Sequence, residues 1–201
     1  MKRFSDHTYR VLRFLAHGLL RFVHPIARYR GKENVPEGAA VVVCNHSAFT
    51  DPVWVQIAMK TKRLPLTMAK KELTKNKLFW AFCHKVGAFP VDRDGSDIQA
   101  IKTSLQCLRD DNKLLIFPEG TRVRHGKTAT AHNGAMMIAC RAKVPILPVY
   151  LTAKKSIFSA IDVVIGAPYM PLYEGAKPTS QELDRLTQQM MDQIYAMGET
   201  R

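Results

Sequence analysis

The chain has 201 residues, enough for one domain with a full hydrophobic core. Its four cysteines lie far apart and form no C-x-x-C pair, which argues against a zinc ribbon or a thioredoxin motif and is typical of a reducing compartment. The formal net charge of +13 predicts an anionic partner: nucleic acid, an acidic protein, a phosphorylated substrate or an anionic membrane.

Residues 1–30 combine basic and apolar side chains in the pattern of an amphipathic helix. Basic residues recur at spacings of three and four, which predicts that they share one helix face: Arg10, Arg13, His17, Arg21, His24 and Arg28. No run reaches the roughly 20 apolar residues of a membrane span. The pattern favours a helix in a membrane interface, with arginines at the lipid phosphates, over a surface helix docked on the domain. Pro25 is expected to bend or end it.

Between residues 31 and 201, apolar β-branched runs alternate with helical periods. Strands are predicted at 39–44, 64–69, 86–91, 113–117, 144–151 and 161–165. Helices are predicted at 52–59, at 131–142 and after two capping boxes, Ser96 with Gln99 and Thr179 with Glu182. The alternation predicts an α/β domain over 31–201, with a mixed, partly parallel sheet flanked by helices, behind an amphipathic membrane-interface helix over 1–30.

Residues 70–82 mix lysines with large apolar side chains. They are compatible with a second membrane-facing or acyl-facing helix and, equally, with a helix whose aromatic residues join the core.

The stretch from Val41 to Pro52 is the most informative for function. A buried strand is predicted to end at His46, and Pro52 suits the first position of a helix capped by Asp51. The short loop can bring the Asp51 carboxylate back to the His46 imidazole, the arrangement of a general base held by an acid. The alternative is a plain helix cap beside a loop histidine.

Further polar residues follow strands, at Asp92 and Arg93 and again at 119–122. The carboxyl ends of parallel strands meet at one edge of a sheet, so these residues and His46 are predicted to form one site. Gly126-Lys127-Thr128 is similar to the end of a P-loop, but five residues separate Gly120 from Gly126 where that motif has four. No serine-hydrolase elbow, metal-ligand spacing or nucleic-acid signature is present in the sequence, so neither a metal nor nucleic acid is expected.

Four segments, in order, resemble the sequence blocks of the glycerolipid acyltransferases. They are NHSAFTD at 45–51, with its H-x4-D motif, GAFPVDR at 87–93, FPEGTR at 117–122 and VPILPV at 144–149. The resemblance spans roughly residues 30–170 and is greatest to the bacterial 1-acyl-glycerol-3-phosphate acyltransferases, which make phosphatidic acid. One departure is visible at 132–134, which read His-Asn-Gly where relatives often carry a lysine-glycine pair.

The resemblance implies roles for individual residues. His46 is the expected base and Asp51 its orienting partner, in direct acyl transfer without an acyl-enzyme. The expected substrate-binding residues are Arg93, Glu119, Gly120, Thr121 and Arg122, with the two arginines clamping the acceptor phosphate. The expected oxyanion donors are Lys70, Lys71 and the backbone N–H at Gly120.

The resemblance also implies partners and a location. Lysophosphatidic acid is the expected acceptor, an acyl-carrier-protein or coenzyme A thioester is the expected co-substrate, and no cofactor is expected. The expected location is the cytoplasmic face of the cell membrane, with peripheral or monotopic attachment to its anionic surface. The alternatives are acylation of glycerol-3-phosphate or another lyso-lipid, and a non-catalytic membrane-binding protein of the same fold.

Overall fold

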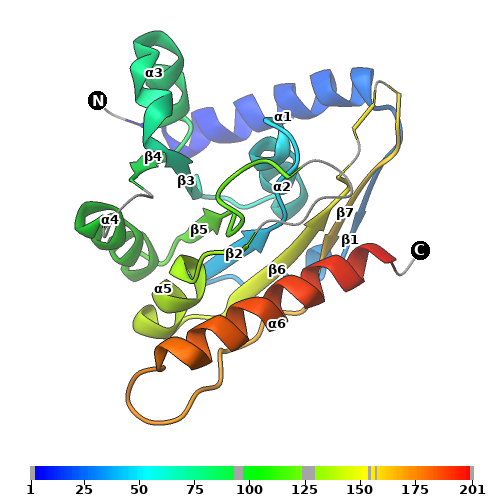
Figure 1. The fold of residues 1–201 in the computed structure, drawn as a ribbon. Coiled ribbons are helices and arrows are strands. Elements are labelled where there is room, and N and C mark those ends of the chain that lie inside the picture. The colour runs from blue at the N-terminus through cyan, green and yellow to red at the C-terminus, as the bar shows by residue number, and fades with distance from the viewer. Residues whose placement is uncertain (1–2, 93–96, 124–129, 154, 157, 200–201) are drawn as a thin grey trace.

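A seven-stranded sheet forms the centre of the molecule (Figure 1). The computed structural model describes residues 3–92, 97–123, 130–153, 155–156 and 158–199. The strands follow the order β1-β7-β6-β2-β5-β3-β4, and every neighbouring pair is parallel except β6 and β7. This mixed, mostly parallel sheet confirms the predicted fold class. The strands are β1 (Ala27–Arg30), β2 (Ala40–Cys44), β3 (Leu66–Lys70), β4 (Ala88–Val91), β5 (Lys113–Ile116), β6 (Ile146–Leu151) and β7 (Ile161–Ile165).

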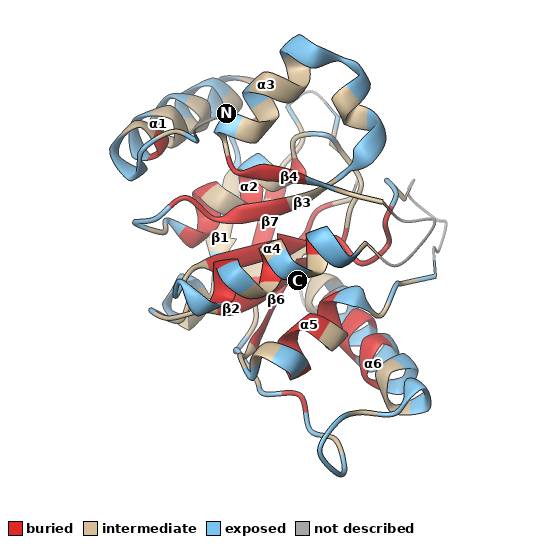
Figure 2. Ribbon diagram, turned by 90° about the vertical axis from the view of Figure 1, so that its left-hand side faces the viewer, coloured by how far each residue is buried: buried red, intermediate tan, exposed pale blue. Residues whose placement is uncertain are grey.

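Helices cover both faces of the sheet. One core lies between the sheet and α4, α5 and α6, and the other lies between the opposite face and α2, against which α1 packs. Figure 2 shows the buried strands between these layers, with α3 at the rim. The helices are α1 (Asp6–Val23), α2 (Asp51–Met59), α3 (Lys77–Lys85), α4 (Ile98–Arg109), α5 (Gly134–Ala142) and α6 (Ser180–Glu199), with 3-10 turns η1 (Lys32–Asn34) and η2 (Lys71–Lys75).

Strand β2 lies in the middle of the sheet and is buried throughout. Val41 and Val43 join the core beneath α4, α5 and α6, whereas Val42 and Cys44 join the core beneath α2. A strand buried on both faces reads as a continuous apolar run, which is why the sequence placed β2 to within one residue. The neighbouring strands β5 and β6 run parallel to β2, so the loops after all three strands meet at one edge.

Helix α1 is present, but part of its predicted basic face contacts the domain. Tyr9 is buried, Arg13 donates to the carbonyl of Thr61 at 2.5 Å, and His17 packs edge-on against Tyr29. Part of the basic side therefore faces the domain instead of forming a free row. The exposed surface of the helix carries five large apolar residues, Val11, Phe14, Leu15, Leu19 and Phe22, together with Arg10 and Arg21. None of the helices in the described ranges is long and apolar enough to cross a membrane.

The short edge strand β1 follows α1 and was not predicted. Arg28, which was placed on the helix face, lies in β1 and pairs with Asp162 of the neighbouring strand β7 at 3.2 Å. His24 ends α1 as a buried residue, with Nδ1 3.3 Å from the carbonyl oxygen of Ser159. Residues 27–30 therefore belong to the sheet and not to an N-terminal helix.

One of the two predicted capping boxes is confirmed. The N–H of Glu182 donates to Thr179 Oγ1 at 3.2 Å, and its carboxylate accepts from the N–H of Thr179 at 2.8 Å. At α4 the N-cap is Asp97, whose carboxylate accepts from the N–H of Ala100 at 2.8 Å. The predicted cap, Ser96, lies outside the described residues. Either acid or hydroxyl can cap a helix, so the sequence left the start of α4 uncertain by one residue.

The segment over 70–82 forms η2 and the beginning of α3. None of the residues of α3 is buried, and Leu78 and Phe82 are 83% and 56% exposed. The alternative in which this helix joins the core is therefore wrong. The helix lies beside the chain just before α1, because the N–H of Phe4 donates to the carbonyl of Lys85 at 3.0 Å.

Candidate active site

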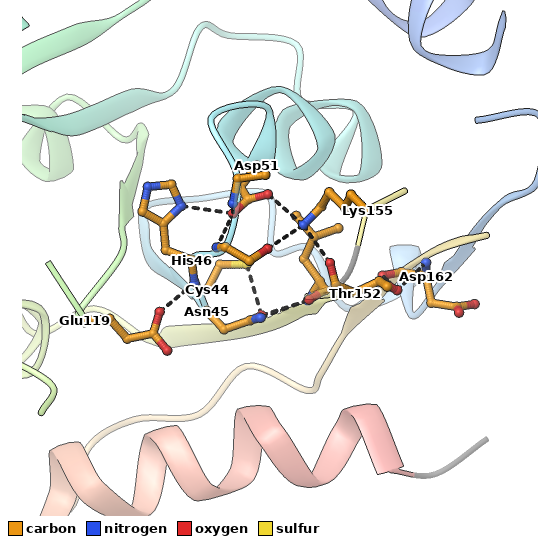
Figure 3. A network of polar contacts seen from close by, with 11 residues as sticks. Cys44, Asn45, His46, Asp51, Glu119, Thr152, Lys155 and Asp162 are labelled. Atoms are coloured by element: carbon orange, nitrogen blue, oxygen red, sulfur yellow. Dashed lines mark hydrogen bonds and ion pairs between the residues drawn. The ribbon is translucent and has the colours of Figure 1, made fainter. Parts of the chain in front are cut away.

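The loop between β2 and α2 carries the predicted catalytic pair (Figure 3). Asn45 holds the end of the strand: its amide donates to the carbonyl of Leu151 at 2.9 Å, and its own carbonyl accepts from the N–H of Leu151 at 2.8 Å. Helix α2 then begins at Asp51, with Thr50 as its N-cap. Asp51 is therefore not the cap that the sequence predicted. Its carboxylate turns back into the loop instead.

One oxygen of the Asp51 carboxylate organises this loop. Oδ2 accepts from the N–H groups of Ser47 at 2.6 Å and Ala48 at 2.8 Å, and from Nδ1–H of His46 at 2.9 Å. The last bond fixes the tautomer of His46 and leaves Nε2 as the proton acceptor. The structure thus joins His46 and Asp51 in the geometry of a base held by an acid, as the sequence predicted.

The other oxygen of Asp51 faces a lysine. Asp51 is fully buried, and its Oδ1 lies 2.9 Å from Nζ of Lys155. Burial alone raises the pKa of Asp51, but the hydrogen bond from His46, the charge of Lys155 and the N–H of Ala48 outweigh it and lower the pKa below its ordinary value. Asp51 is therefore ionised at neutral pH.

His46 borders a cavity of about 990 Å³. The imidazole is 18% exposed and stacks on Phe117, with the ring centroids 4.3 Å apart. A volume of this size holds an acyl chain together with a polar head group. Polar residues on its wall include Lys70, Asp92, Thr121, Arg122 and His132, and apolar residues include Leu12, Leu15, Leu19, Phe49, Phe82 and Ile101.

Three of the predicted substrate-binding residues line this cavity, namely Gly120, Thr121 and Arg122. Gly120 turns the chain with a positive φ of 65°, a conformation that favours glycine. Its N–H donates to the carbonyl of Phe117 at 3.0 Å, so the predicted use of this amide as an oxyanion donor is wrong. Arg93 lies outside the described residues, and its role stays a prediction.

Glu119 does not face the cavity as predicted. It is 3% exposed, and its carboxylate accepts from the backbone N–H of His46 at 2.7 Å and from the hydroxyl of Tyr195 in α6. Burial raises the pKa of Glu119, although the hydrogen bonds from Tyr195 and His46 oppose the shift. Glu119 therefore holds the catalytic loop from behind, because it is buried and is not among the residues that line the cavity.

The two lysines predicted as oxyanion donors differ in position. Lys70 lines the cavity at the end of β3 and pairs with Glu72 at 2.9 Å. Lys71 is absent from the cavity wall and pairs with Asp92 at 2.9 Å. Lys70 is thus the better placed of the two, and the role of Lys71 stays a prediction.

The cysteines offer no second nucleophile or metal site. All four are free thiols, and burial raises the pKa of each, that of Cys107 to about 11. Over the described parts of the chain, histidine, cysteine and acidic side chains nowhere gather in threes as metal ligands.

Sequence reasoning missed Tyr195 and Lys155 as parts of the site. Tyr195 is 76 positions from its partner Glu119, and Lys155 is 108 positions from Ser47, to which it also donates. Neither residue belongs to a local pattern. Asn45 was noticed only as part of a motif, because its bonds to Leu151 depend on the pairing of β2 with β6.

Comparisons with known proteins agree with this geometry. The family model described as Acyltransferase matches residues 26–152. The 1-acyl-sn-glycerol-3-phosphate acyltransferase of Bacillus subtilis is 30% identical over 169 residues, which cover 81% of this chain and 83% of that protein. The protein of the same name from Streptococcus pneumoniae is 35% identical over 147 residues, 72% of this chain and 54% of the relative.

The fold also has a solved counterpart. The crystal structure of the 1-acyl-sn-glycerophosphate (LPA) acyltransferase PlsC from Thermotoga maritima aligns with a TM-score of 0.70 and 21% identity, over 98% of this chain and 80% of that chain. The shared fold, the match to the family model over most of the chain and the Bacillus relative together show that this chain belongs to the acyltransferase family.

Proposed function

We propose that the protein transfers a fatty acyl chain from an acyl thioester to the free hydroxyl of 1-acyl-sn-glycerol-3-phosphate, which makes phosphatidic acid. The observation that carries the proposal is the His46–Asp51 pair, whose imidazole borders a large, mainly apolar cavity that also contains Arg122. The relatives from Bacillus subtilis and Streptococcus pneumoniae, both named for this reaction, support the choice of acceptor.

The geometry supports direct transfer. Nε2 of His46 takes the proton of the acceptor hydroxyl while the oxygen attacks the thioester carbonyl. Collapse of the tetrahedral intermediate breaks the carbon–sulfur bond, and the leaving thiolate receives the proton from His46. Ser47, the nearest hydroxyl in sequence, accepts a hydrogen bond from Lys155 at 2.6 Å and does not line the cavity. No acyl-serine step is therefore part of the proposal.

Arg122 is the proposed anchor for the acceptor phosphate, together with Arg93. A guanidinium can hold two phosphate oxygens at once, whereas an ammonium acts as a point charge. We expect Arg122→Lys to raise the KM for the acceptor roughly tenfold and to leave the KM for the acyl donor nearly unchanged. Steady-state kinetics with each substrate varied in turn measure both constants. Arg109→Lys, an exposed arginine at the end of α4, is the matched control. Equal increases in both KM values would contradict an acceptor-specific role.

An acyl-transfer assay tests the reaction itself. The purified full chain is incubated with acyl-carrier-protein or coenzyme A thioesters and with one acceptor at a time: 1-acyl-glycerol-3-phosphate, glycerol-3-phosphate or a lyso-lipid without a free phosphate. We expect phosphatidic acid from the first acceptor. Product only from glycerol-3-phosphate or another lyso-lipid would reassign the acceptor. No product from any pair would favour the non-catalytic membrane-binding alternative.

The proposed function places the protein on an anionic membrane, at its cytoplasmic face. Phe14, Leu19 and Phe22 of α1 are 77%, 68% and 82% exposed, and Leu78 and Phe82 of the neighbouring α3 also face outward. Leu19 and Phe82 line the cavity as well, so the exposed apolar surface continues into the site. A lipid acceptor can then enter from the bilayer without passing fully into water.

Membrane binding by α1 is testable with exposed side chains alone. We expect the triple variant Phe14→Ser, Leu19→Ser, Phe22→Ser to bind anionic vesicles at least about tenfold more weakly, because three large apolar groups lose their contact with lipid. Activity on vesicle-embedded acceptor should fall more than activity on a short-chain soluble acceptor. Vesicle flotation and paired assays measure the two effects.

The control for this variant is Leu172→Ser. Leu172 is 81% exposed and belongs to the connection between β7 and α6. Figure 1 shows that this connection reaches the start of α6 on the side of the molecule away from α1. The variant Leu172→Ser should float with the vesicles to the same extent as the unmodified chain. If the triple variant also floats normally, α1 is a scaffold element and membrane contact lies elsewhere.

A further inference from the structure

We propose that Lys155 is a positioning residue of the catalytic pair: its ammonium is the cation that the buried Asp51 carboxylate requires, which leaves His46 free to be neutral and to accept a proton. The inference rests on the proposed role of His46 as the base. Figure 3 shows the order of the three side chains, with Asp51 between His46 and Lys155.

The ammonium of Lys155 contacts three oxygens: one through an ion pair and two through hydrogen bonds. Nζ lies 2.9 Å from Asp51 Oδ1 and donates to Ser47 Oγ and to the carbonyl of Thr152, each at 2.6 Å. The lysine side chain is 6% exposed and the Asp51 side chain is fully buried. Neither lines the cavity that His46 borders. Lys155 therefore acts through Asp51 and does not touch the substrate.

The rest of the loop fixes the position of Lys155. The N–H of Thr152 donates to the carbonyl of Asp162 at 3.0 Å, and the N–H of Asp162 donates to Thr152 Oγ1 at 2.8 Å. The N–H of Phe158 donates to the carbonyl of Val23 at 3.1 Å, at the end of α1. The loop is thus tied to β7 and to α1, on both sides of the lysine.

The role of Lys155 follows from the need to balance the charge of the buried Asp51 carboxylate. A carboxylate without access to water needs a compensating cation, and two groups can supply one to Asp51. If His46 were the only one, the resting pair would be carboxylate and imidazolium, and Nε2 would already carry the proton that it must accept. Lys155 balances the Asp51 charge without that proton, and its own charge disfavours an imidazolium nearby.

Other ionisable groups around His46 are accounted for. Among the described residues these are Glu119 after β5, Tyr195 from α6, Cys44 in β2, and Arg122 and His132, which line the same cavity as His46. Burial raises the pKa of Cys44 and of Tyr195, so both stay neutral at the pH of the reaction. Glu119 reaches His46 through its backbone N–H and not through the ring. Lys155 is therefore the lysine that pairs directly with the Asp51 carboxylate, at 2.9 Å.

The test is the pH dependence of kcat/KM. For Lys155→Met, which keeps the length of the side chain and removes the charge, we expect the acidic limb of the profile to move to higher pH by about one unit. Activity should then fall about tenfold at pH values well below the midpoint of the acidic limb, and less at the alkaline plateau. In Lys155→Arg, which keeps the charge, the acidic limb of the kcat/KM profile should lie close to that of the unmodified chain, even if the maximal kcat/KM at alkaline pH is lower. Lys102→Met, which removes an exposed lysine from α4, controls for net charge.

A second measurement does not depend on turnover. The NMR titration of the His46 ring should move in the same direction in Lys155→Met. Lys155→Gln replaces the methionine variant if that variant does not fold. The proposal would be overturned if Lys155→Met lost the same fraction of activity at every pH and neither the acidic limb of its kcat/KM profile nor the His46 titration shifted. Lys155 would then be a structural residue. The unmodified chain in the same assay tests the acyltransferase function separately.

Discussion

Replacing His46 with alanine is expected to lower acyl transfer about 10²–10⁴-fold, the usual contribution of a general base. The protein should remain folded, because the bonds that hold the loop do not use the imidazole. Glu119 accepts from the backbone N–H of His46, and Asp51 accepts from the N–H groups of Ser47 and Ala48. Asp51 also keeps its ion pair with Lys155. The loss should therefore appear in kcat and not as unfolding.

Initial rates at saturating donor and vesicle-embedded acceptor measure this loss, with circular dichroism and thermal unfolding as checks on the fold. Gln188→Ala, an exposed position on α6, serves as the unaffected control. Turnover by His46→Ala close to that of the unmodified chain would rule out His46 as the base, whatever the fate of the fold.

The sequence predicted the centre of the sheet well, and the edge poorly. Strand β2 is an unbroken apolar run because both of its faces are buried. Strand β1 reads Ala-Arg-Tyr-Arg, and alternate residues are exposed. Four residues with two charges carry too little apolar signal to be separated from the preceding helix.

The N-terminal helix shows a second limit. Spacing predicted an amphipathic helix, but spacing does not say which side contacts the protein. Tyr9 is buried, Arg13 donates to the carbonyl of Thr61, and His17 packs edge-on against Tyr29. The apolar side of the helix is left for another partner, and only the folded domain decides this choice.

In the candidate site, contacts between residues close in the sequence were predicted, and contacts between distant segments were not. His46 and Asp51 are five positions apart, so a loop motif sufficed to predict their contact. The predicted place of Glu119 on the substrate side was wrong, because Glu119 is buried against Tyr195 of the last helix, a contact that no local pattern in the sequence indicates. Lys155 was missed for the same reason. Local chemistry can be read from a motif, whereas its supporting contacts depend on how distant segments meet.

Asp51→Asn is the second change with a large expected effect, a loss of acyl transfer of about 10²–10⁴-fold. The substitution keeps the shape of the side chain and removes its charge, so the imidazole loses the partner that stabilises its protonated form during the reaction. If the amide oxygen takes the place of Oδ2 toward Ser47 and Ala48, the NH₂ group faces the Lys155 ammonium, donor against donor. Either orientation of the amide leaves N–H groups without acceptors.

The same change should destabilise the fold by about 3 kcal/mol at neutral pH, because it leaves a buried lysine without its counter-charge. The direction in which this difference in stability changes with pH follows from the pKa of Asp51. Asp51 has a lower pKa in the folded than in the unfolded state, so its stabilisation is complete above about pH 4 and is lost as the pH falls through the folded value. The difference in unfolding free energy between the unmodified chain and Asp51→Asn should therefore shrink on acidification from pH 5 to pH 3.

Urea unfolding at several pH values measures this difference, and Asp192→Asn, at an exposed position on α6, is the matched control. The control should show neither the loss of stability at pH 7 nor the narrowing below pH 4. A fully active Asp51→Asn would mean that His46 needs no carboxylate. An inactive variant whose stability equals that of the unmodified chain at pH 7 would mean that the ion pair with Lys155 adds no stability, while the role of Asp51 toward His46 would stand.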